Sequence, residues 1–391
     1  MSINRFFDKS KIFYIFFMSI QHLRSAGSFV SCGSFQDHIQ RFEVNDNPQL
    51  ILNSSVVEAF GRGKCPKVVR LLTHRKEDVV QKALLTLTSI LKFPQDVAMC
   101  VKCGILVHLE KYLMNSTPTL RSLSAKCIEL IALTANGKRA LLDGNTPSRI
   151  HESLHDKQID VRYHITTALI QCSSTTNDAT VLTSSDYIPI VVRRLQIEPR
   201  GNLQVLVLRL LKNCVCDTNT DSLKQAYDAG AVDAIFPLIA SPLPIVREAA
   251  CAALESICFL SSARYDAVEK TAVVKLVHLL MDDCWQVVSA AAGALMALSI
   301  QDNTKRQLVD TDGISYFGPL LMSSKWIVQL KILKLIAIVA PYPPARHVLR
   351  VPSILASLRA LSKDTDAIIA KSAKITLGIL CPPTKSFIVS K

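Results

Sequence analysis

Apolar residues along this chain follow a long repeat, and within each repeat they follow the shorter spacing of an α-helix. From residue 61 onward, a segment that often ends in a leucine pair is followed by a polar turn and a longer apolar segment. In the fifth longer segment the apolar residues step by three and four, at Val246, Ala249, Ala250, Ala253, Leu254 and Ile257. Such steps put side chains on one face of an α-helix. The pattern predicts short helices that alternate with longer ones.

Each longer segment starts near an apolar residue that we call the anchor. The anchors are Val80, Leu120, Val161, Leu203, Val246, Val287, Val328 and Ile369, separated by 40, 41, 42, 43, 41, 41 and 41 residues. A period of this length is typical of armadillo and HEAT repeats. The sequence therefore predicts an all-α, right-handed superhelical solenoid of about eight such units, numbered here by anchor, in which each unit packs on its neighbours.

The two ends of the chain lack this period. Residues 1–58 are expected to form a poorly ordered extension, residues 59–381 the solenoid and residues 382–391 a tail, with Pro382 and Pro383 ending the last helix. The apolar stretch 12–17 is too short to span a bilayer as a helix, so no stable membrane span is predicted. A targeting segment, a flexible extension and a misassigned start all stay open for the first 50 residues.

Composition narrows the class of partner and the compartment. The chain has 45 Lys and Arg against 32 Asp and Glu, a net charge of +13, which favours acidic partners. It has no block of like charges, so nucleic acid is not expected as a partner. The 12 cysteines are irregularly spaced, and several lie at apolar helix positions, including Cys127, Cys172, Cys214 and Cys251. This usage predicts core packing in a reducing compartment such as the cytoplasm.

The unit shape of a glycine, a short helix, a leucine pair, a turn and a longer helix resembles the armadillo repeat. Three stretches narrow the resemblance: the lead-in 59–62 with Pro66 and Lys67, the charged residues 75–84, and the sixth unit at 276–283 and 291–296. They are similar to the radial spoke head fourteen homologue family, armadillo proteins of motile cilia and flagella. The resemblance covers roughly residues 58–380. It implies a structural part of the axonemal radial spoke, with no catalytic residues and no cofactor.

Another armadillo function can be tested against the anchors. Nuclear-import receptors of the importin-alpha type hold basic peptides with Trp six residues after the anchor and Asn ten residues after it. Here no Trp stands at the first position, and Asn213 is the only Asn at the second. Cations stand at the first position in three units, at Lys126, Arg209 and Lys334, and they would repel a basic peptide. Carriage of basic cargo is therefore not predicted.

Two motifs suggest metal chemistry, but their context favours a structural role. Residues 151–155 read His-Glu-Ser-Leu-His, the zinc-protease pattern, in which histidines four apart share a helix face. The repeat places them on the second helix of unit three, with Ile150 and Leu154 in the core, and we expect two solvated histidines. The pairs Cys100/Cys103 and Cys214/Cys216 lack a second pair at zinc-finger spacing. We predict no catalytic residue, metal site or small-molecule substrate.

Two sets of residues are candidates for protein binding. Cations on the face of the long helices that would line a concave groove suit an acidic extended segment, although a solvated helix face explains them equally well: Lys82, Lys126, Arg209, Lys212, Lys334 and Lys371. Trp285 and Trp326 each lie two residues before an anchor, so their indoles are expected to lie along one ridge. Exposed Trp at a repeated position is a binding hot-spot candidate, and packing at the unit junction is the alternative.

The sequence thus predicts a non-catalytic protein-interaction scaffold. The leading hypothesis is a radial-spoke component in the axoneme of a cilium or flagellum, bound to other spoke proteins. The alternative is a general cytoplasmic armadillo adaptor that holds an acidic extended peptide in its groove. A hydrolase built on His151 and His155 ranks a distant third.

Overall fold

A computed structural model describes residues 61, 63–175, 187–215 and 220–382 of this chain. The expectations for residues 1–58 and 383–391 lie outside the described residues. The described residues all belong to one compact unit. Every regular element within the described ranges is a helix, which confirms the all-α prediction.

The long helices follow the anchors closely. Each of the eight begins two or three residues before its anchor and has 14 or 15 residues. They are α4 (Glu77–Ile90), α7 (Pro118–Ala132), α10 (Ile159–Cys172), α13 (Gly201–Cys214), α16 (Pro244–Ile257), α19 (Trp285–Leu298), α22 (Trp326–Val339) and α25 (Ala367–Leu380). The eight predicted units are therefore present.

Shorter helices precede each long helix. The first short helices of the units are α5 (Pro94–Lys102), α8 (Ala135–Asp143), α14 (Thr220–Asp228), α17 (Ser261–Glu269), α20 (Asp302–Asp310) and α23 (Pro343–Leu349). The second are α3 (Lys64–Leu71), α6 (Ile105–Leu113), α9 (Thr146–Ile150) with η2 (His151–His155), α12 (Tyr187–Ile197), α15 (Ala231–Ile235) with η3 (Phe236–Ala240), α18 (Ala272–Leu279), η4 (Gly313–Tyr316) with α21 (Phe317–Leu321), and α24 (Pro352–Leu361). Three of these second elements contain a tighter 3₁₀ turn.

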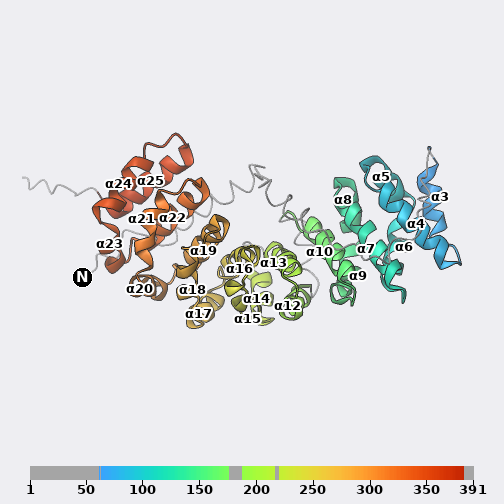
Figure 1. The fold of residues 1–391 in the computed structure, drawn as a ribbon, viewed down its shortest axis with the longest axis horizontal. Coiled ribbons are helices and arrows are strands. Elements are labelled where there is room, and N and C mark those ends of the chain that lie inside the picture. The colour runs from blue at the N-terminus through green and yellow to red at the C-terminus, as the bar shows by residue number, and fades with distance from the viewer. Residues whose placement is uncertain (1–60, 62, 176–186, 216–219, 383–391) are drawn as a thin grey trace, which may run out of the picture. The chain divides into compact units, whose positions relative to one another are not determined.

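The core runs along the stacked long helices, each of which packs on the next from α4 to α25 (Figure 1). The pair α16 and α19 has the most extensive contact, where small residues such as Ala250, Ala253 and Ala291 are fully buried. Small side chains let helix axes approach closely. The predicted core cysteines Cys127, Cys172, Cys214 and Cys251 are buried, and burial raises the pKa of Cys127 and of Cys214 to about 12.

An arginine clamp joins neighbouring units. The residue after the anchor is arginine in units two, three and five, at Arg121, Arg162 and Arg247. Each donates from Nη1 to the two backbone carbonyls of the turn before its own helix, and from Nε to an acid of the next unit, at Asp156, Glu198 and Asp282 respectively. The guanidinium therefore fixes a turn and a unit junction together.

The first turn of α8 needs a glycine, Gly137, for reasons of space. A Cβ on Gly137 would lie 2.0 Å from the carbonyl oxygen of Ile131, a backbone atom at the end of α7 that cannot swing aside. We expect Gly137→Ala to lower the free energy of unfolding by about 1–3 kcal/mol, as overpacking does. Urea titration followed by far-UV circular dichroism measures the change.

Gly378 provides the matched control for this substitution. It lies inside α25, and a Cβ there would meet nothing within 4 Å. Gly378→Ala should leave stability unchanged or raise it by up to about 1 kcal/mol, because alanine favours the helix. Equal losses at both positions would show that the contact with Ile131 is not what makes Gly137 necessary.

Candidate protein-binding surfaces

The six predicted cations do not form one uniform row. Lys82, Lys126, Lys212 and Lys371 are exposed, and Arg209 is half-buried. Lys334 is only 4% exposed, and burial together with nearby Lys331 lowers its pKa to about 8. The position of Lys334 therefore departs from the expectation of a solvent-facing cation, because neighbouring units cover its side chain.

Acidic residues also lie on the long helices, where they pair with other basic side chains. Lys331 of α22 pairs with Glu255 of α16 at 2.7 Å, a contact that crosses over α19. The crossing is possible because α19 has a glycine there: a Cβ on Gly293 would lie 2.3 Å from Glu255 Oε2 and 2.7 Å from Lys331 Nζ. His164 of α10 also contacts Glu129 of the adjacent helix α7. The face thus carries mixed charge with an excess of cations.

The two tryptophans begin equivalent helices in consecutive units, and Lys325 lies over the ring of Trp285. Trp285 is the first residue of α19 and Trp326 the first residue of α22. Lys325, the residue before Trp326, places its ammonium 5.7 Å from the centre of a Trp285 ring, within the range of a cation–π contact. Trp285 is half-buried beneath it, whereas Trp326 is 45% exposed. Trp326 therefore presents the larger accessible indole surface.

A second set of apolar residues shares this edge of the solenoid. The position six residues before the anchor, at the end of the second helix or in the turn after it, is highly exposed and apolar in four units, at Met114, Ile197, Met281 and Met322. In units six and seven this methionine and the tryptophan lie at the two ends of the same turn. We call Met281, Trp285, Met322, Lys325 and Trp326 the Met–Trp ridge. Sequence analysis found its tryptophans but not its methionines, although the anchor register marks both.

The His-Glu-Ser-Leu-His motif differs from its prediction. It forms the 3₁₀ helix η2, and at three residues per turn positions i and i+4 do not share a face. His151 Nδ1 lies 2.6 Å from the Ser148 carbonyl oxygen, and its ring meets Tyr187 edge-on at 6.1 Å. Both histidines are partly buried, so the expectation of two solvated side chains was wrong. Across the described ranges, no cluster of three or more potential metal ligands occurs.

His155 gives this region a predicted pH dependence. Burial and the adjacent Arg194 lower the pKa of His155 below 6.5, and its Nε2 has no hydrogen-bond partner. Between the lowered pKa and 6.5 the unfolded chain binds more protons than the folded chain. The free energy of unfolding is therefore unaffected by His155 above pH 6.5, and it falls as the pH drops from 6.5 towards the lowered pKa.

We expect His155→Gln to flatten this slope in urea titrations made between pH 5.5 and 7.5. His278→Gln, at an exposed histidine of α18, is the control and should keep the wild-type slope. If both variants keep it, another group is responsible for the pH dependence.

A buried ion triad lies beside this motif, at the junction of units three and four. Glu198, 3% exposed, accepts from Arg162 Nε at 3.1 Å and from Arg194 Nη2. Two buried guanidinium groups thus share a single carboxylate. The arrangement holds α10 and α12 together, and it is structural in character because both oxygens of Glu198 are engaged.

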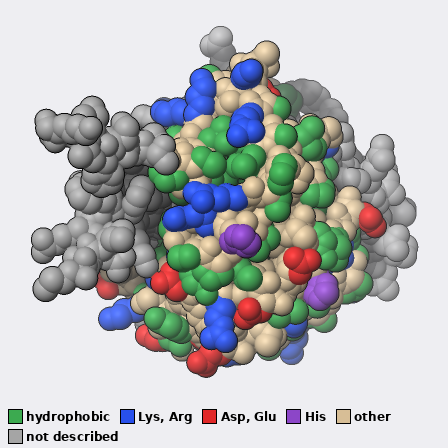
Figure 2. All heavy atoms as spheres, turned by 90° about the vertical axis from the view of Figure 1, so that its left-hand side faces the viewer, with side chains coloured by type: hydrophobic (Ala, Val, Ile, Leu, Met, Phe, Trp, Pro, Cys, Tyr) green, Lys and Arg blue, Asp and Glu red, His purple; other side chains and the backbone are tan. Residues whose placement is uncertain are grey.

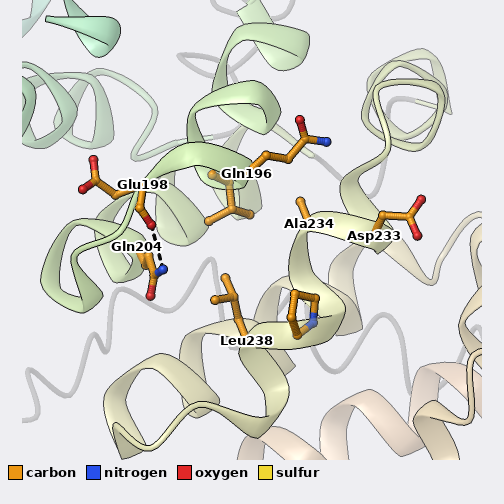
Figure 3. Close-up of a pocket in the computed structure, with 8 residues that line it drawn as sticks. Gln196, Glu198, Gln204, Asp233, Ala234 and Leu238 are labelled. Carbon is orange, nitrogen blue, oxygen red and sulfur yellow. Dashed lines mark hydrogen bonds between the residues drawn. The ribbon is translucent and has the colours of Figure 1, made fainter.

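The same glutamate lines a small pocket of about 210 Å³ between α12 and unit five (Figure 3). Gln204 donates to the Glu198 carbonyl oxygen at 2.8 Å along one wall. The other lining acid, Asp233, pairs with Lys270 at 3.2 Å. Both lining carboxylates are therefore engaged by basic side chains. The pocket is lined by Leu195, Gln196, Glu198, Gln204, Asp233, Ala234, Pro237 and Leu238.

The C-terminal end of the stack shows the same mixture of surface types. Lys and Arg residues lie among apolar side chains in the upper half of the face seen in Figure 2, whereas acids and further cations occupy its lower half. On α25, Ile368, Lys371 and Lys374 are exposed. No helix in the described ranges is both long and apolar enough to cross a membrane.

Comparison with known proteins identifies a relative by sequence and, independently, solved structures with a similar fold. No family model matches this chain. It is 29% identical over 248 residues to Radial spoke protein 14 of Chlamydomonas reinhardtii, a match that covers 60% of this chain and 64% of that protein. The match thus spans less than two thirds of the relative's length.

Solved structures give the fold. An engineered protein superposes with a TM-score of 0.63 at 22% identity, over 81% of this chain and 89% of that one. A designed armadillo repeat protein in complex with the peptide (KR)4 superposes with a TM-score of 0.54 at 19% identity, over 60% of this chain and 99% of that one. The chain has the armadillo-repeat fold, and its sequence is similar to Radial spoke protein 14.

Proposed function

We propose that this chain is a non-catalytic protein-binding scaffold and a structural component of the axonemal radial spoke. The observation that carries the proposal is the similarity to Radial spoke protein 14, which falls on a chain whose described part is an armadillo solenoid. The proposed location is the axoneme of a cilium or flagellum, and the proposed partners are other spoke proteins.

The physical character of the solenoid supports a scaffold role. Stacked units expose a long lateral surface, and they keep it in place through contacts between neighbours. Here the arginine clamps fix three junctions, between units two and three, three and four, and five and six, so positions on these units keep a defined spacing. A scaffold must hold partners at fixed separations, and this arrangement supplies such separations.

The test is the location of the tagged full-length chain in a flagellated cell, together with the proteins that copurify with it. A second chain beginning at residue 50 tests whether the first residues are needed. We expect both in the axoneme with radial-spoke proteins. A diffuse pool that copurifies with no spoke protein would overturn the spoke role and leave the general adaptor as the better hypothesis.

The adaptor hypothesis has its own supporting observation. Lys82, Lys126, Lys212 and Lys371 are exposed on long helices of units one, two, four and eight. A segment rich in Glu and Asp would meet these cations. Replacing Lys126 and Lys212 by Glu should abolish salt-sensitive capture of a poly-glutamate peptide, whereas Lys92→Glu, at an exposed lysine in the turn after α4, should not.

A further inference from the structure

The Met–Trp ridge exposes more apolar surface than a solvated turn requires. Met281 is 53% exposed and Met322 66% exposed, beside the partly exposed Trp326. The corresponding turns of units one, three and eight carry His74, His155 and Lys363 instead. Contiguous exposed apolar side chains on adjacent units mark an interaction site, whereas scattered single ones do not.

The spacing of the ridge selects the shape of its partner. Packed neighbouring helices lie about 8–10 Å apart, so equivalent side chains of units six and seven repeat at about that distance. On an α-helix, residues seven apart share a face and lie about 10.5 Å apart. On a strand, same-face residues lie about 6.8 or 13.6 Å apart, neither of which fits. A helix laid across the two units therefore matches the ridge, and a strand does not.

Charge fixes how such a helix would lie. Lys325 is exposed and lies over the Trp285 ring, and Arg247 already engages Asp282 of the unit-six turn. The remaining acid of that turn, Asp283, is exposed. It would repel a carboxylate of the partner that lay against unit six instead of unit seven. A partner acid is therefore attracted to the unit-seven turn and rejected at the unit-six turn.

We propose that the Met–Trp ridge binds an amphipathic helix of a partner protein, with apolar residues seven apart and an acidic residue facing Lys325. The inference rests on the proposed scaffold function and names the chemistry of one partner segment. The site lies on the edge formed by the turns before the long helices, apart from the cations of Lys82 and Lys126.

The chain contains its own reporter for this site, because Trp285 and Trp326 are its only tryptophans. The probe is a tryptophan-free 21-residue helical peptide with leucine at the first and fourth positions of each heptad and glutamate at the flanking positions. Its addition should shift tryptophan emission to shorter wavelength in a saturable way. A twin with lysine for glutamate should bind at least about tenfold more weakly, and Lys325→Glu should reverse that preference.

Two controls make the result specific. Met281→Ser with Met322→Ser should weaken binding by about tenfold or more, as loss of exposed hot-spot side chains does. Met114→Ser, the same change at the equivalent and 65% exposed position of unit two, should leave binding unchanged. A peptide of alternating leucine and glutamate that binds as tightly as the helical one would overturn the proposal, as would an unshifted emission with the glutamate peptide.

The same double variant separates this inference from the spoke role. If the wild-type chain reaches the axoneme and Met281→Ser with Met322→Ser does so with an unchanged set of spoke proteins, the ridge proposal fails and the scaffold stands. If the glutamate peptide binds the ridge while the wild-type chain stays out of the axoneme, the spoke role fails and the ridge stands. Loss of one spoke protein from the variant alone would support both.

Discussion

Glu198→Gln is expected to lower the free energy of unfolding by about 3–5 kcal/mol, the loss typical when one partner of a buried ion network is removed. Glutamine keeps the volume of the side chain and removes its charge. The Arg162 and Arg194 guanidiniums, both under 10% exposed, would then lie close together with no anion between them. Arg162 cannot swing out to water without breaking its bonds to the Asp156 and Lys157 carbonyls.

The control for this prediction is an ion pair at the surface. Arg306 and Asp310 lie 3.5 Å apart on α20 with side chains 71% and 61% exposed. Asp310→Asn should change the free energy of unfolding by less than about 1 kcal/mol, because water and salt screen such pairs. Both variants are measured by urea titration with far-UV circular dichroism. A loss at Glu198 as small as the control would mean that water already reaches the triad.

The repeat architecture could be predicted in detail because its signal is periodic and local. Each long helix starts within three residues of its anchor, since the same apolar stripe must meet the same neighbour in every unit. The equivalent positions of the two tryptophans, each at the start of a long helix, followed from the same register. Features that one unit carries in itself were therefore accessible from the sequence.

Features that depend on a neighbouring unit were not accessible. Lys334 looks like any other cation at its position, and only the surrounding helices make it buried. Glu255 and Lys331 are 76 residues apart, and their contact needs Gly293 on the helix between them. The arginine clamps reach carboxylates 35 or 36 residues ahead. An arginine after the anchor, with an acid in the next turn, is the signal that could have revealed the clamps.

The His-Glu-Ser-Leu-His motif illustrates a different limit. Its helical face was assigned on the assumption of α-helical geometry, but the chain there tightens into η2 before the turn at Asp156. Ser153 and Leu154 are buried, and neighbouring side chains partly cover each of the two histidines. Periodicity specifies which residues face the core over a long helix, and five residues are too few for it to distinguish an α-helix from a 3₁₀ turn.

Phe317→Ala is expected to lower the free energy of unfolding of the C-terminal units by about 3–5 kcal/mol, the loss typical of a fully buried aromatic side chain. Phe317 is 0% exposed and begins α21, which packs on α22 and α24. The turn that follows α21 carries Met322 and Lys325 of the Met–Trp ridge. Phe93→Ala is the matched control, because Phe93 is 55% exposed and its removal leaves no comparable cavity.

Two probes show where the loss of Phe317 is felt. Tryptophan emission reports on units six and seven, whereas far-UV circular dichroism reports on all eight long helices. Because each unit is stabilised by its neighbours, the emission transition of Phe317→Ala should move to lower urea by more than the dichroism transition. Equal shifts in both signals would mean that the solenoid unfolds as one cooperative body. In that case the ridge would share the stability of the whole stack, and a partner bound there would stabilise every unit alike.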